Sequence, residues 1–205
     1  RQIKKDGGQI HVNAKALGWE ERNGEAIVKA EVDGKVQEFA TDVILVAVGR
    51  RPVTKGFGLE KTGVKVGERG FIPVDQRQQT NVPGIYAVGD VCGQPMLAHK
   101  ASHEGVICVE KIAGVKDVHP LNVKNIPGCT YCWPQVASVG LTEKAAKEKY
   151  KDVKVGRFQF IGNGKAIALG EPEGLVKTIF DAKTGELLGA HMIGAEVTEM
   201  IQGYA

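Results

Sequence analysis

The chain has 205 residues, which is enough for one large or two small domains. With 42% hydrophobic and 25% charged residues, its composition is that of an ordinary soluble globular protein. Its net charge of +3 is too slight to indicate nucleic acid binding, and no apolar stretch approaches the roughly 18 residues of a membrane helix. We therefore expect no nucleic acid and no membrane among its partners.

The start of the sequence and its cysteines indicate the compartment. The chain begins at Arg1, without an initiator Met and without the apolar segment of a signal peptide. Its cysteines are too few and too unevenly spaced for a secreted disulfide framework, and they lie at positions 92, 108, 129 and 132. A reducing, cytoplasmic location is expected.

The first 52 residues predict a β-meander that leads into a buried strand. Asn23-Gly24 and Asp33-Gly34 are strong signals for β-hairpin turns. The strands that they would join lie at 9–17, 26–32 and 35–39. Residues 43–48 form a continuous apolar run, which favours a buried strand ending at Gly49.

Residues 53–97 predict a crossover into a second domain. Turn-rich sequence surrounds a short expected strand near 70–74. Residues 81–84 have turn chemistry, and the apolar run 85–88 is consistent with a strand buried on both faces. Gly89 would let a ligand approach the backbone, and Asp90 would follow at the carboxyl end of the strand, where open α/β sheets bind ligands.

The rest of the chain predicts a helix and then an α+β layer. The helix spans 98–113 with Gly114 as its C-cap, and its apolar stripe consists of Val106, Cys108, Val109 and Ile112. Thr142 is a good N-cap for a short helix at 143–150. Strands are expected at 131–140, interrupted or placed at an edge by Pro134, and at 153–160, 175–180 and 187–193, followed by a helix from Val197.

Residues 80–90 and 96–101 together resemble the second flavin-contacting motif of the FAD-dependent disulfide oxidoreductases. Met96 to Ala101, with Glu104-Gly105, is most similar to the dihydrolipoamide dehydrogenase branch of that family. The resemblance covers essentially the whole chain. It implies the end of a Rossmann-like NAD-binding domain at 1–52, a second segment of the FAD-binding domain at 53–122, and an α+β dimerisation domain at 123–205.

The same resemblance implies the cofactor contacts. The Asp90 carboxylate would accept hydrogen bonds from the ribityl hydroxyls of FAD, although a carboxylate here could also cap a turn. Met96, Leu97, Ala98 and His99 would run beside the flavin ring, where helix-start N–H groups stabilise negative charge, unless they are only a helix start. Gly49 and Ala16 would contact NAD, or have only structural roles.

Several parts of the family pattern are not found in these 205 residues. No Gly-x-Gly-x-x-Gly motif occurs, so neither dinucleotide pyrophosphate site can be built from this chain. The redox cysteine pair and the acid–base His with its Glu are also missing. We therefore expect no catalytic residue here, and a portion of a longer enzyme that does not hold FAD alone.

The pair Cys129 and Cys132 raises the question of a metal or redox site. Zinc needs about four ligands, and a thioredoxin-type pair needs a helix amino terminus, whereas this pair precedes Pro134 in an expected strand. We expect no metal. The family usually has a Thr and a His or Asp near Cys132, so the local interface contacts are left open.

The function that this resemblance implies is the oxidation of protein-bound dihydrolipoamide, through a cysteine pair and FAD, with NAD as acceptor. The implied partners are a second copy of the chain, bound through the C-terminal segment, and the lipoyl domains of a 2-oxo acid dehydrogenase complex. The alternatives are another flavin disulfide reductase of the superfamily, a dimerisation module without catalysis, and a zinc-binding module.

Overall fold

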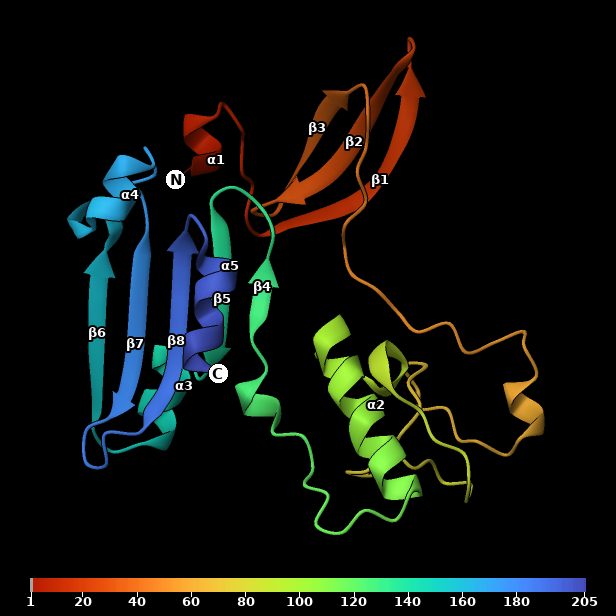
Figure 1. The fold of residues 1–205 in the computed structure, drawn as a ribbon. Coiled ribbons are helices and arrows are strands. Elements are labelled where there is room, and N and C mark those ends of the chain that lie inside the picture. The colour runs from red at the N-terminus through yellow and green to blue at the C-terminus, as the bar shows by residue number, and fades with distance from the viewer. Residues whose placement is uncertain (1) are drawn as a thin grey trace. The chain divides into compact units, whose positions relative to one another are not determined.

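The computed structural model describes residues 2–205 and divides them into two compact units, which meet in the sequence between Arg50 and Arg51 (Figure 1). The first unit contains a short helix, α1 (Gln2–Lys5), and a three-stranded antiparallel sheet. The strands of this sheet, in both chain and spatial order, are β1 (Ala14–Arg22), β2 (Glu25–Val32) and β3 (Lys35–Thr41). The second unit holds a loop-rich segment with one long helix, followed by a five-stranded sheet.

Both predicted hairpins of the first unit are confirmed. Asn23 and Gly24 have φ values of 57° and 83°, and Asp33 and Gly34 have φ values of 49° and 78°. Two consecutive positive φ values define the turn whose twist suits a two-residue β-hairpin. The first strand, however, begins at Ala14 and not at residue 9, because Ala14 already pairs with Val32, the last residue of β2.

The predicted buried strand at 43–48 is wrong. These residues have no regular structure, and the exposed fractions of Leu45, Val46 and Val48 are 88%, 74% and 91%. A buried strand needs a hydrogen-bonded neighbour on each side. In the part of the first unit that the structure describes, the sheet contains β1, β2 and β3 only.

Two more predicted strands, near 70–74 and at 85–88, do not form. Each segment makes single backbone hydrogen bonds in place of a ladder. The Ile72 N–H donates to the Val91 carbonyl at 2.9 Å, and Gln79 and Tyr86 form an isolated antiparallel bridge. Between Arg51 and the long helix, the regular elements are the 3₁₀ turns η1 (Leu59–Lys61) and η2 (Gly89–Cys92).

The long helix, α2 (Ala98–Ile112), is confirmed together with its end. Gly114 has a φ of 73°, and the N–H of Val115 donates to the Glu110 carbonyl at 3.0 Å, as in a Schellman cap. The predicted apolar stripe is wrong, because of its members only Cys108 is buried. Val106, Val109 and Ile112 are 55%, 64% and 60% exposed. The buried face is instead the i, i+4 row of Lys100, Glu104 and Cys108.

The C-terminal part folds around an antiparallel sheet of order β4-β5-β8-β7-β6 (Figure 1). Its strands are β4 (Gly128–Thr130), β5 (Gln135–Gly140), β6 (Val153–Gln159), β7 (Leu175–Asp181) and β8 (Leu187–Gly194). Its helices and 3₁₀ turns are η3 (Val123–Asn125), α3 (Glu143–Lys149), η4 (Phe160–Gly162), α4 (Gly164–Ala168), α5 (Val197–Met200) and η5 (Ile201–Tyr204). The predicted strand at 131–140 is therefore shorter than expected, because only residues 135–140 form a strand, β5, and Pro134 lies in the link between β4 and β5.

Local sequence accounts for these elements. The Thr142 hydroxyl accepts the Ala145 N–H at 3.2 Å, which confirms the predicted N-cap of α3. Val197 and Ile201, 0% and 1% exposed, pack in one core cluster with inward-facing residues of β5 and β8. Ile201 is therefore part of the core, whereas the neighbouring Met200 is 42% exposed.

Candidate functional site

The turn that carries Asp90 lies directly against α2. Gly89 is buried and has a φ of 84°, and a Cβ added to it would come within 3.3 Å of the Ala101 methyl carbon. A glycine is needed here both for its backbone conformation and for the close approach of α2. This corrects the sequence-based interpretation of Gly89, because a helix of the same unit, not a ligand, occupies the space beside it.

Asp90 itself is exposed at the start of the 3₁₀ turn η2. The turn closes through the N–H of Gly93, which donates to the Asp90 carbonyl at 3.2 Å. The backbone is therefore held on the protein side, and the carboxylate lies at the surface. An exposed carboxylate in a fixed turn can accept hydrogen bonds from the hydroxyls of a ligand.

The start of α2 is the second part of the site. Leu97 is its N-cap residue, and no side chain makes a capping hydrogen bond there. Ala98 and His99 are exposed in the first turn. Because the first N–H groups of a helix have no partner within it, this end can stabilise negative charge on a ligand.

Met96 is buried, whereas His99 is exposed. Met96 is only 7% exposed, and its N–H donates to the Gln94 Oε1 atom at 3.2 Å. The His99 Nε2 atom lies 2.9 Å from the Pro127 carbonyl oxygen. His99 also lines a hollow of about 540 Å³, together with Lys100, His103 and residues of η3 to β4, α5 and η5. Met96 thus supports the turn from inside, and His99 connects α2 to the segment before β4.

This arrangement fits the polar side of a flavin. Asp90 supplies hydrogen-bond acceptors, and the start of α2 supplies uncapped N–H donors on the same unit, eight residues later in the sequence. A chain of hydroxyls needs acceptors, and an electron-rich ring edge needs donors. The residues present therefore match the chemistry of both groups.

Gly49 and Ala16 lie in the other unit, residues 1–50. Gly49 has a φ of 123° and is exposed, and no atom within 4 Å would meet a Cβ added to it. Ala16 pairs with Ala30 at a register shift of β1. The open space at Gly49 suits the approach of a ligand to the backbone.

Sequence reasoning missed the roles of Lys100 and Glu104, although it included both in the flavin motif. They form an ion pair of 2.8 Å, with side chains that are 6% and 7% exposed. The signal was present in the sequence, because a Lys and a Glu four residues apart lie on the same face of a helix. The apolar stripe predicted for this helix places other residues on its inner face and does not predict the pair.

Cys92 and Cys129 have the character of structural thiols. Burial, with a smaller contribution from the Glu104 carboxylate, raises the pKa of Cys92 to about 11. Burial also raises the pKa of Cys129, which lies in β4, whereas Cys132 is exposed in the following loop. A thiol with a raised pKa is a poor nucleophile at neutral pH. Within residues 2–205, no group of three or more His, Cys, Asp and Glu side chains is placed to hold a metal ion.

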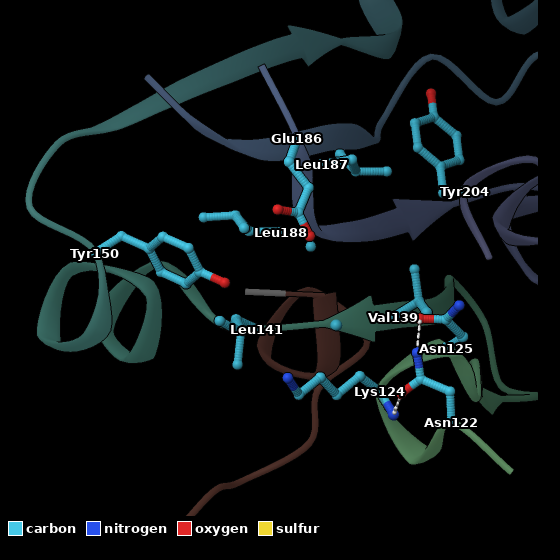
Figure 2. Close-up of a pocket in the computed structure, with 12 residues that line it drawn as sticks. Asn122, Lys124, Asn125, Val139, Leu141, Tyr150, Glu186, Leu187, Leu188 and Tyr204 are labelled. Carbon is cyan, nitrogen blue, oxygen red and sulfur yellow. Dashed lines mark hydrogen bonds between the residues drawn. The ribbon is translucent and has the colours of Figure 1, made fainter. Parts of the chain in front are cut away.

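A separate hollow of about 160 Å³ lies between β5, β8 and η3 (Figure 2). The Tyr150 and Leu188 side chains lie on one side of it, and Asn122 and Asn125 lie on the other (Figure 2). The two asparagines are hydrogen-bonded to each other at 3.2 Å. None of the residues predicted to bind a cofactor lines this hollow.

The fold contains no membrane-spanning candidate among the residues described, since none of these helices is both long enough and apolar enough.

A strong ion-pair cluster lies on the surface of the C-terminal part. The Glu143 carboxylate contacts Lys147, Arg157 and Lys177 at 2.7, 2.6 and 3.0 Å. Hydrogen bonds from Lys147 and Lys177 lower the pKa of Glu143 to about 2.

Two family models match the chain. Residues 1–105 match the pyridine nucleotide-disulphide oxidoreductase model, and residues 126–205 match the dimerisation domain of the same family. Over all 205 residues the chain is 58% identical to a dihydrolipoyl dehydrogenase of Rhizobium etli, of which it covers 42%. It is 59% identical over 175 residues, 85% of the chain, to a dihydrolipoyl dehydrogenase of Zymomonas mobilis, of which it covers 37%. The chain thus spans about two fifths of the length of these relatives.

Solved structures agree with this fold. The flavoprotein disulfide reductase RclA of Escherichia coli, induced by HOCl, superposes with a TM-score of 0.90 at 28% identity over 98% of this chain and 44% of that one. LpdA of Mycobacterium tuberculosis superposes with a TM-score of 0.86 at 25% identity over 98% of this chain and 43% of that one.

Proposed function

We propose that this chain, which belongs to the pyridine nucleotide-disulphide oxidoreductase family, is the flavin-positioning and dimerising part of a dihydrolipoyl dehydrogenase. The observation that carries the proposal is the Gly89–Gly93 turn, which presents Asp90 beside the uncapped start of α2. The identity of 58% over the whole chain to the Rhizobium etli enzyme supports it. The whole enzyme would oxidise protein-bound dihydrolipoamide with NAD as acceptor.

The chemistry of such an enzyme comes from FAD and a redox disulfide, which pass two electrons from the dithiol to NAD. The residues of this chain would bind and orient. The Asp90 carboxylate would accept hydrogen bonds from the ribityl hydroxyls. The first N–H groups of α2, at Ala98 and His99, would stabilise negative charge at the edge of the flavin ring. Met96 and Leu97 would fix the backbone that leads into this turn.

The remaining parts of the proposal concern the other segments. Residues 1–52 would be the end of the NAD-binding domain, with Gly49 and Ala16 beside the dinucleotide. Residues 53–122 would belong to the FAD-binding domain. Residues 123–205 would join two subunits, in agreement with the dimerisation-domain match at 126–205. The partners would be a second copy and the lipoyl domains of a 2-oxo acid dehydrogenase complex, in the cytoplasm.

The test is an Asp90→Ala substitution in the complete enzyme. Loss of charge-assisted hydrogen bonds worth about 1.5–3 kcal/mol should accelerate FAD release on dilution by roughly tenfold or more. Glu60→Ala is a matched control, because Glu60 is an exposed carboxylate in another 3₁₀ turn of the same unit. Release that is unchanged in Asp90→Ala, or equally fast in the control, would contradict the role of Asp90.

The alternative is another flavin disulfide reductase, which the superposition with RclA favours. Turnover of dihydrolipoamide with NAD, compared with turnover of other dithiols and disulfides, separates the two. The 205-residue chain by itself should not hold FAD, because it has no glycine-rich pyrophosphate loop. A stoichiometric flavin spectrum of the isolated chain would contradict that expectation.

A further inference from the structure

Two opposite charges are buried under the turn that carries Asp90. Lys100 and Glu104 are each 5% exposed, although both are charged and lie one helical turn apart on α2. The Lys100 Nζ atom lies 2.8 Å from the Glu104 Oε1 atom. Charged side chains are rarely buried this far unless they are paired, so the position of this pair requires an explanation.

The pair binds the backbone on both sides of Asp90. The second carboxylate oxygen of Glu104, Oε2, accepts the N–H of Gly89 at 2.7 Å. The Lys100 ammonium donates to the carbonyl of Gly89 at 3.4 Å and to the carbonyl of Gly93 at 3.3 Å. The pair thus acts as a clamp, defined here as Lys100 and Glu104, on the residues that bracket Asp90.

The turn needs such a clamp because of its glycines. Gly89 and Gly93 have φ values of 84° and 114°, and glycine adopts many other conformations at little cost. At the far end of the turn, the Gly93 N–H donates to the Asp90 carbonyl at 3.2 Å, whereas Glu104 and Lys100 bind the N–H and the carbonyl of Gly89. The three bonds from the clamp restrict both glycines, so that the direction of the intervening Asp90 is set before a ligand arrives.

Stability alone is a weak reason for the clamp. A buried ion pair is often no more stable than a well-packed apolar pair of similar volume, because both charges lose their hydration. Preorganising a binding group, in contrast, strengthens binding by removing the cost of ordering it. On the basis of the function proposed above, we propose that Lys100 and Glu104 are positioning residues for the flavin, and that they act through Asp90.

The test compares a clamp variant with a surface control in the complete enzyme. Lys100→Met with Glu104→Gln removes both charges and keeps both side-chain lengths. Glu143→Gln with Lys147→Met removes an i, i+4 pair of 2.7 Å from the surface of α3. A misdirected Asp90 loses on the order of one charge-assisted bond, so FAD release should be about tenfold faster in the clamp variant and unchanged in the control.

A double-mutant cycle with Asp90→Ala tests whether the clamp acts on FAD release through Asp90. If the clamp acts through Asp90, adding the clamp substitutions to Asp90→Ala should change FAD release by less than about threefold, since the shared interaction is already lost. A further tenfold effect in that background would refute action through Asp90. If the clamp variant does not fold, Glu104→Gln alone, which keeps an oxygen to accept the Gly89 N–H, enters the same cycle.

Amide hydrogen exchange of the cofactor-free enzyme tests whether the clamp restrains the turn, independently of the proposed function. Exchange at residues 89–93 should accelerate in the clamp variant and stay unchanged in β5 and β8. Unchanged exchange at 89–93 would overturn the clamp itself. Faster exchange together with unchanged FAD release in both the clamp variant and Asp90→Ala would leave the clamp standing, but it would refute its role toward the flavin and the proposed role of Asp90.

Discussion

Replacing Gln78 by Met should stabilise the chain. Gln78 is 6% exposed, and its Oε1 atom is buried without a hydrogen-bond partner within residues 2–205. Its backbone is satisfied, because its N–H donates to the Asp75 carbonyl at 3.1 Å and its carbonyl accepts the Ala87 N–H at 3.0 Å. The missing hydrogen bond is therefore that of the side-chain oxygen and not of the backbone. A buried polar group without a partner costs about 1–3 kcal/mol of stability.

Met has the length and flexibility of Gln without its amide, and the φ of 68° at this position disfavours both residues alike. We expect the free energy of unfolding to rise by about 1–2 kcal/mol, after a small repacking cost. For a chain of this size, each kcal/mol raises the melting temperature by about 2–4 °C. Thermal unfolding followed by circular dichroism measures this change, with Gln76→Met, at an exposed position of the same loop, as control. A melting temperature that falls, or that rises equally in the control, would refute the reasoning.

Three further predictions concern the C-terminal part. The pKa of Glu143 is lowered to about 2, so its contribution to stability is present above its usual pKa and is lost as the pH falls toward 2. Acid unfolding of Glu143→Gln should therefore begin from a lower stability at neutral pH and show a weaker pH dependence between pH 4.5 and 2. Substituting Ser for both Cys129 and Cys132 should leave turnover and bound metal unchanged in the complete enzyme, because Cys129 is a thiol of raised pKa in a strand. Loss of turnover in a folded dimer would contradict this prediction. Analytical ultracentrifugation should find the 205-residue chain associated and a 1–122 truncation monomeric, and a monomeric whole chain or a dimeric truncation would count against the dimerisation assignment.

Local chemistry made part of the fold predictable. The two hairpin turns, the Thr142 cap and the Gly114 C-cap each depend on a few adjacent residues, and all four are present. The antiparallel strands β7 and β8 were also predictable, because they follow each other closely along the chain. Long-range pairing was not predictable. The apolar run at 43–48 has the composition of a buried strand, but composition does not reveal whether a neighbouring strand is there to receive its hydrogen bonds.

The candidate site shows a different limit of sequence reasoning. The Gly-Asp motif gave the position of Asp90, whereas the buried face of α2 was assigned by hydrophobicity and was wrong. Hydrophobicity predicts the inner face of a helix when that face meets other apolar side chains. At α2 the neighbouring surface is the η2 turn, whose backbone N–H and carbonyl groups are buried by the contact. Buried backbone groups require hydrogen-bond partners, so Lys100 and Glu104, not Val106 and Val109, face inward. The amphipathic pattern of a helix therefore has to be judged together with what the helix covers.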